Sequence, residues 1–183
     1  LRGGPRVNIS YVHGICMQHD AISNSIRDEI AWPSPAHQVR LFAYACDQPQ
    51  LPFTKVDDLR ALVFDPHFRA SELVVFHFGV HYLLFDALTV CPANAKRLVV
   101  FHNITPKEFV TPNHHATADL SFRQLANLMF ADHVVCDSQT NLDVMRAAGI
   151  DTPATVLPLA LHSHHEPPLA KPSTINGLRS SRL

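Results

Sequence analysis

The sequence is poor in the features that mark several large functional classes. No apolar stretch approaches the ~20 residues that a membrane-spanning helix needs, and the longest candidate, between Leu73 and Leu88, is interrupted by histidine, glycine and aspartate. Lysine and arginine (15) do not exceed aspartate and glutamate (16), so the composition gives no sign of nucleic-acid binding. These absences favour an ordinary globular protein.

Several widespread catalytic motifs are missing as well. The chain has no GxSxG nucleophile elbow, no P-loop, no GxGxxG and no HExxH. The usual signatures of hydrolases, NTPases and dinucleotide-binding enzymes are therefore absent. Thirteen histidines are present, but their clusters have no cysteines nearby at zinc-ligand spacing. We therefore expect no metal site and no cofactor.

Cysteine is scarce and irregularly placed. The four cysteines form no CxxC pair, and a chain of this size can build a core without a disulfide framework. This usage predicts reduced, buried thiols in a cytoplasmic protein.

The 183 residues, 46% of them hydrophobic, are sufficient for one domain with a substantial core. Short β-rich runs alternate with helical patterns, which predicts an α/β fold: a doubly wound, mostly parallel, Rossmann-like sheet in a single three-layer α/β/α domain. We expect this domain over residues 1–161, and a linker or disordered tail over residues 162–183, where prolines replace apolar periodicity. The expected strands cover 7–12, 38–45, 72–78, 97–101, 133–136 and 154–157.

The helices between these strands follow from capping residues and apolar spacing. We expect them over 20–30, 57–64, 80–88, 119–130 and 140–148, with a long loop over 104–116. Asp20 is the expected N-cap of the first helix. In the helix over 119–130 the expected inward residues are Leu120, Leu125, Leu128 and Met129.

Polar residues follow several of the expected strands directly. The clearest case is Leu98–Phe101, a buried run that ends in His102 and Asn103, followed by a Thr-Pro break. The carboxyl ends of parallel strands lie along one edge, where α/β folds bind ligands, so we expect these residues to converge. The further candidates are His13, Gly14, His77, Gly79 and Ser138.

Each candidate has a structural alternative. A strand-end histidine often only satisfies nearby carbonyls, although the Asn103 and Thr-Pro context favours a ligand-binding role for His102. Ser138 is equally suited to cap the helix that follows it and to bind a hydroxyl-rich or anionic ligand there.

In their order and spacing, these motifs resemble the N-terminal half of GT-B glycosyltransferases of the family 4 (group 1) type. The segments that carry the resemblance are His13–Ile15, Val75–Tyr82, Phe101–Pro106, Ser121–Leu125, Ala131–Ser138 with Asn141, and Val156–Leu159.

The resemblance implies transfer of a hexose from a nucleotide-diphosphate sugar to a glycan or lipid-linked saccharide, with retention and without a catalytic metal. By this analogy Gly14 lies near the donor phosphate and His102 near the transferred sugar as the catalytic residue. His13, His77, Gly79, Asn103 and Ser138 would bind substrate. The resemblance implies a cytoplasmic enzyme and leaves open peripheral association with the inner face of the membrane.

Two departures from the family pattern shape these expectations. The loop after the first strand lacks the usual paired glycines, and the donor-binding C-terminal GT-B domain is expected outside this sequence. We therefore expect the 183 residues alone to be inactive. The alternatives are a non-catalytic carbohydrate- or nucleotide-binding module of the same fold and a small α/β enzyme acting on a phosphosugar.

Overall fold

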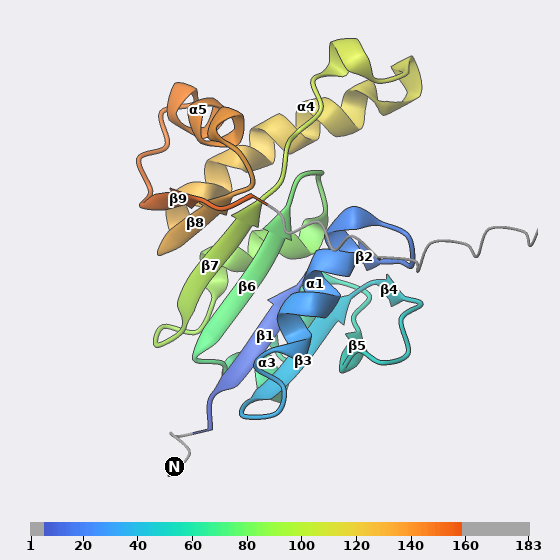
Figure 1. The fold of residues 1–183 in the computed structure, drawn as a ribbon, viewed down its shortest axis with the longest axis vertical. Helices are drawn as coiled ribbons and strands as arrows, with labels where there is room; N and C mark the ends of the chain where they lie inside the picture. The colour runs from blue at the N-terminus through green and yellow to red at the C-terminus, as the bar shows by residue number, and fades with distance from the viewer. Residues whose placement is uncertain (1–5, 159–183) are drawn as a thin grey trace, which may run out of the picture.

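The computed structural model describes residues 6–158 and contains a central sheet of seven parallel strands (Figure 1). The strand order is β5-β3-β1-β6-β7-β8-β9, and β1 is followed by β3 on one side and β6 on the other, so the order reverses at β1. The strands are β1 (Asn8–Val12), β3 (Gln38–Ala43), β5 (Phe53–Lys55), β6 (Leu73–Phe78), β7 (Lys96–Phe101), β8 (His133–Cys136) and β9 (Ala154–Val156).

The sheet is covered on both faces, and strict alternation along the strands separates two hydrophobic clusters. In β6, Val74 and Phe76 pack in the larger cluster, whereas Val75 packs in the smaller one. The smaller cluster contains Ile26 and Ile30 of α1 (Ala21–Ala31), which lies in front of β1 and β3 in Figure 1. The expected three-layer α/β/α domain is confirmed.

The larger cluster is built on the opposite face from several short elements. They are α2 (Leu59–Val63), α3 (Pro66–Arg69), the 3₁₀ helices η1 (Leu83–Val90) and η4 (Leu125–Phe130), and α5 (Gln139–Ala147).

Local capping residues explain where the helices begin and end. The carboxylate of Asp20 accepts the backbone N–H of Ser23, as expected for the N-cap of α1. Ser138 caps α5 through the N–H of Asn141. Gly149, with a φ of 77°, follows the end of α5 in the left-handed conformation that glycine tolerates.

All six predicted strands are present, but the sequence patterns missed the shorter elements. These are the edge strand β5, the helix α3, and a separate two-stranded sheet of β2 (Ile15–Cys16) and β4 (Ala45–Cys46). The expected helix over 80–88 begins only at Leu83 and is 3₁₀ in character. The expected loop over 104–116 contains two 3₁₀ turns, η2 (Lys107–Phe109) and η3 (Pro112–His114), and the start of α4 (His115–Gln124).

The prediction for the face of the helix over 119–130 was half wrong. Leu125 and Leu128 are buried as expected, but Leu120 and Met129 are 40% and 60% exposed. The segment changes from α4 to 3₁₀ at Leu125, and the change from 3.6 to 3 residues per turn rotates the buried face.

The predicted tail over 162–183 and the last residues of the predicted domain lie outside the described residues. Within residues 6–158, no helix is long and apolar enough to cross a membrane. All four cysteines are free thiols, but only Cys16 and Cys136 are buried as predicted, whereas Cys46 and Cys91 are partly exposed.

Two neighbouring residues of η4 test the revised packing. Leu128→Ala should lower the free energy of unfolding by about 2–5 kcal/mol, because Leu128 is fully buried. Met129→Ala should change it by less than about 0.5 kcal/mol, because Met129 is exposed. Urea unfolding of the two variants measures both values, and equal losses would contradict the assigned face.

Candidate functional site

Three polar side chains meet on one face of the sheet because of strand alternation and register. His77 lies in β6, next to Val75, which packs against α1. Phe101 pairs with Cys136, so the next residues, His102 and Asp137, extend the same register beyond the ends of β7 and β8. All three side chains reach the face that α1 covers.

Together with Glu29 of α1, these residues form a continuous carboxylate–imidazole chain: Glu29, His77, His102 and Asp137. Glu29 Oε2 lies 3.1 Å from His77 Nε2, and His77 Nδ1 lies 3.0 Å from His102 Nε2. His102 Nδ1 lies 2.5 Å from Asp137 Oδ2. Both imidazoles are buried, and their ring planes are nearly parallel, with an interplanar angle of 18°.

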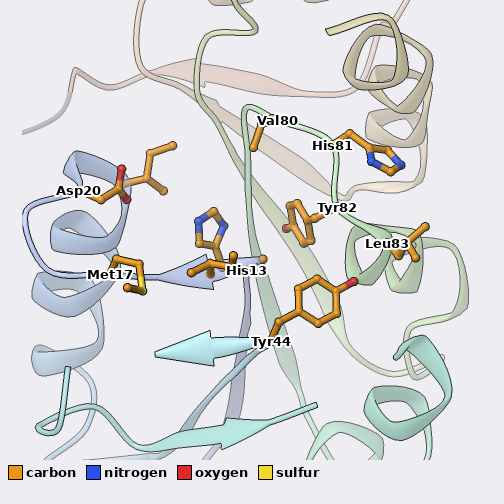
Figure 2. A pocket seen from close by; sticks show the side chains of 11 residues that line it. His13, Met17, Asp20, Tyr44, Val80, His81, Tyr82 and Leu83 are labelled. Carbon is orange, nitrogen blue, oxygen red and sulfur yellow. The ribbon is translucent and has the colours of Figure 1, made fainter. Parts of the chain in front are cut away.

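A cavity lies next to this carboxylate–imidazole chain, where the strand order reverses. We call it the edge pocket; its volume is about 640 Å³, within the range of small-molecule sites. Figure 2 shows the ring of His13 directed into the space between α1 and the segment after β6. The lining residues are His13, Gly14, Ile15, Met17, Asp20, Ile22, Tyr44, Val80, His81, Tyr82 and Leu83.

His13 presents an unprotonated ring nitrogen to the edge pocket. Its Nδ1 lies 3.2 Å from the carbonyl oxygen of His77; a carbonyl only accepts, so Nδ1 carries the proton. Burial, and then the nearby His77, lower the pKa of His13 to about 4. The imidazole is therefore neutral at physiological pH, and Nε2, which has no hydrogen-bond partner within residues 6–158, is an acceptor.

Tyr82 closes the floor of the edge pocket. Its hydroxyl is shared between the carbonyl oxygens of His77, at 2.8 Å, and Val12, at 3.3 Å. Burial raises the pKa of Tyr82 well above its usual value, so the phenol stays a donor. The ends of β1 and β6 are thus joined through one side chain.

Two polar residues of α4 hold the wall of the edge pocket. The side-chain amide of Gln124 accepts from the N–H of Tyr82 at 3.2 Å and donates to its carbonyl at 3.0 Å. The hydroxyl of Ser121 accepts from the N–H of His81 at 2.8 Å. Both residues are buried and belong to the Ser121–Leu125 segment of the resemblance.

Close backbone packing explains the two glycines predicted at the site. A Cβ on Gly79 would lie 2.9 Å from the Cβ of His102, closer than such atoms come. A Cβ on Gly14 would lie 3.3 Å from the Cβ of Tyr82. Glycine at position 79 therefore allows the loop that carries His102 to approach β6.

The predicted site residues separate into three groups. His13 and Gly14 line the edge pocket, whereas His77 and His102 belong to the carboxylate–imidazole chain, where all four ring nitrogens have partners. The structure does not bring the others to the pocket.

Gly79 lies at the end of β6, where it makes room for His102. Asn103 is exposed, and Ser138 caps α5. A catalytic role for His102 stays a prediction.

Sequence reasoning did not include Glu29 or Asp137 among the candidate site residues. Glu29 stands between Ile26 and Ile30, which face the sheet, and a carboxylate so close to an apolar stripe was the available signal. Burial alone would raise the pKa of Glu29, but the hydrogen bond and charge of His77, together with Ser25, bring it below its ordinary value.

No known family model matches this chain. A comparison with curated proteins also found no match. In the described part of the chain, no group of three or more histidine, cysteine, aspartate or glutamate side chains is arranged to hold a metal ion.

The lowered pKa of His13 gives the fold a pH dependence. The unfolded chain binds a proton at this residue below its ordinary pKa of 6.5, whereas the folded protein does so only near pH 4. The stability that neutral His13 gives the fold is therefore fully present above pH 6.5. It is lost as the pH falls, and at pH 5 the free energy of unfolding is lower by about 2 kcal/mol. Urea unfolding should show a weaker pH dependence in His13→Gln than in the wild type. His133→Gln, on β8, is the control, and parallel profiles for the wild type and His13→Gln would contradict the assignment.

Gly79→Ala tests the close approach of the two strand ends. The added methyl group collides with the Cβ of His102, so we expect a loss of about 1–3 kcal/mol in unfolding free energy and altered imidazole resonances of His102. Val80→Ala, at the exposed neighbouring position, should leave both nearly unchanged. An unperturbed Gly79→Ala protein would show that the loop is free to move.

Proposed function

We propose that this domain is the acceptor-side half of a GT-B glycosyltransferase of the family 4 type. The edge pocket would hold a sugar of the acceptor, a glycan or lipid-linked saccharide. A nucleotide-diphosphate sugar would supply the hexose, transferred with retention. The observation that carries this proposal is the position of the pocket beyond the ends of β1 and β6, where the strand order reverses and α/β sheets bind ligands.

The composition of the pocket wall supports a neutral, hydroxyl-rich ligand. Tyr44, Tyr82 and aliphatic side chains provide apolar surface, which suits the C–H faces of a sugar ring. The Nε2 atom of His13 can accept a hydrogen bond from a sugar hydroxyl. Such a combination of apolar walls with a few fixed polar groups is typical of small-molecule sites.

The charges around the edge pocket favour the acceptor over the donor diphosphate. None of its lining residues, as described, is lysine or arginine, and Asp20 adds a carboxylate. A diphosphate here would lack a counter-charge. We therefore assign the diphosphate mainly to a second GT-B domain, as the resemblance implies, with Gly14 at the boundary between the two substrates.

The cellular location forms part of the same proposal. Four free thiols fit a reducing compartment, and we place the protein in the cytoplasm, with peripheral contact to the inner membrane face if its acceptor is lipid-linked.

Saccharide binding to the 183-residue chain tests the proposal. Saturation-transfer NMR and calorimetry with a panel of neutral oligosaccharides should detect binding, whereas UDP- and GDP-sugars should bind more weakly. His13→Ala should weaken saccharide binding about tenfold, the effect of one lost hydrogen bond. His133→Ala, outside the pocket, should bind as the wild type does.

Two results would count against this function. Tight binding of nucleotide-sugars without saccharide binding would favour a nucleotide-binding module instead. Equal saccharide affinity in His13→Ala and the wild type would remove the edge pocket from the binding site.

A further inference from the structure

The carboxylate–imidazole chain contains four titratable groups joined end to end. It begins at Glu29, whose side chain is 34% exposed, and ends at Asp137, which is 16% exposed. Between them His77 and His102 are almost completely buried. The second carboxylate oxygen of Asp137 is buried without a hydrogen-bond partner, so no further donor in the described structure shares the charge at that end.

Counting protons constrains the state of this chain. Each of its three hydrogen bonds needs one proton, and two neutral imidazoles supply only two. The third proton is either a third ring proton, shared between His77 and His102, or a carboxyl proton. In each of these cases the four groups together carry a net charge of −1, so moving protons along the bonds changes the location of the charge but not its amount.

We propose that Glu29, His77, His102 and Asp137 form a single proton-sharing unit that holds its third proton between the two imidazoles and latches α1 to the ends of β6, β7 and β8. Both carboxylates are then ionised, each accepting an N–H from its own imidazole. The low pKa of Glu29 is in accord with its ionised state.

The groups around this unit come from every neighbouring element. The ring of Tyr11, in β1, stacks on the ring of His77. The ring of His13, in the turn after β1, meets the ring of His77 edge to face. Cys136 precedes Asp137 on β8, and Asp20 lies at the start of α1. Of these, His13 stays neutral and burial raises the pKa of Tyr11 to above its usual range, so neither supplies a charge that replaces a member of the unit.

A fourth proton placed on the imidazoles would break the unit. With both imidazoles fully protonated, Nδ1 of His77 and Nε2 of His102 would each carry a hydrogen across a gap of 3.0 Å. Two donors of like charge cannot share this contact, so one ring must move. Acid therefore releases the Glu29–His77 half of the unit, on α1 and β6, from the His102–Asp137 half at the ends of β7 and β8. Because the carbonyl of His77 also holds His13, the release reaches the edge pocket.

Nitrogen-15 NMR of the imidazoles counts the ring protons directly. At neutral pH we expect His77 and His102 together to show three protonated ring nitrogens. In Glu29→Gln the amide can donate to His77 Nε2, so we expect two. Glu72→Gln, which removes a carboxylate just before β6, should retain three.

Two protonated nitrogens in the wild type, or three in Glu29→Gln, would overturn the proposal. The wild-type spectrum decides the first point even if a variant fails to fold. The measurement needs no ligand, so its outcome is separate from the saccharide-binding test.

An acid titration tests the latch itself. The amide resonances of Glu29 in α1 and of Ser138 before α5 should shift with one common midpoint, together with the two imidazoles. In Glu29→Gln the shifts of these two amides should separate. Different midpoints in the wild type would overturn the coupling between α1 and the end of β8.

Discussion

Parallel pairing from β1 to β8 is the constraint on which the whole site depends. Parallel strands end at one edge, and alternation sends every second side chain to the same face. A shift of one residue in the register of β7 would move His102 to the opposite face, away from Glu29 and α1. The buried apolar residues of β6 and β7 hold that register, because a slip would exchange the residues of the two hydrophobic clusters.

The edge pocket and the carboxylate–imidazole chain lie next to each other, and they differ in polarity. The carboxylate–imidazole chain holds its charge in a buried row of hydrogen bonds. There, the loss of one hydrogen-bond partner costs free energy of folding. The edge pocket is lined mainly by apolar and aromatic groups, with the neutral imidazole of His13, the ring of His81 and the carboxylate of Asp20 as polar groups. His77 joins the two parts, since its ring belongs to the chain and its carbonyl accepts from His13 and Tyr82. A change of protonation in the chain is therefore coupled to the pocket by a backbone group.

Much of the fold follows from local sequence patterns, whereas the site follows only in part. Strand β7 and the cap of α1 at Asp20 depend on neighbours in the sequence, and both were predicted. The inward face of α4 was not, because Ser121 and Gln124 are buried by pairing with backbone groups of the segment after β6. Glu29 was missed for a similar reason: its partner, His77, is 48 residues away, and no local pattern indicates the contact.

The shared hydroxyl of Tyr82 has a consequence for how the sheet opens toward a ligand. The pairing of β1 with β6 ends at Val12 and Phe76, and the carbonyls of Val12 and His77 beyond it both accept from the hydroxyl of Tyr82. The hydroxyl of Tyr82 takes the place of a backbone donor that strand pairing would supply. Its ring covers the two carbonyl acceptors with an aromatic surface. The gap between the two strands is thus sealed by a side chain, and the polar side chains that face the cavity, His13, Asp20 and His81 among them, come from the segments around that gap.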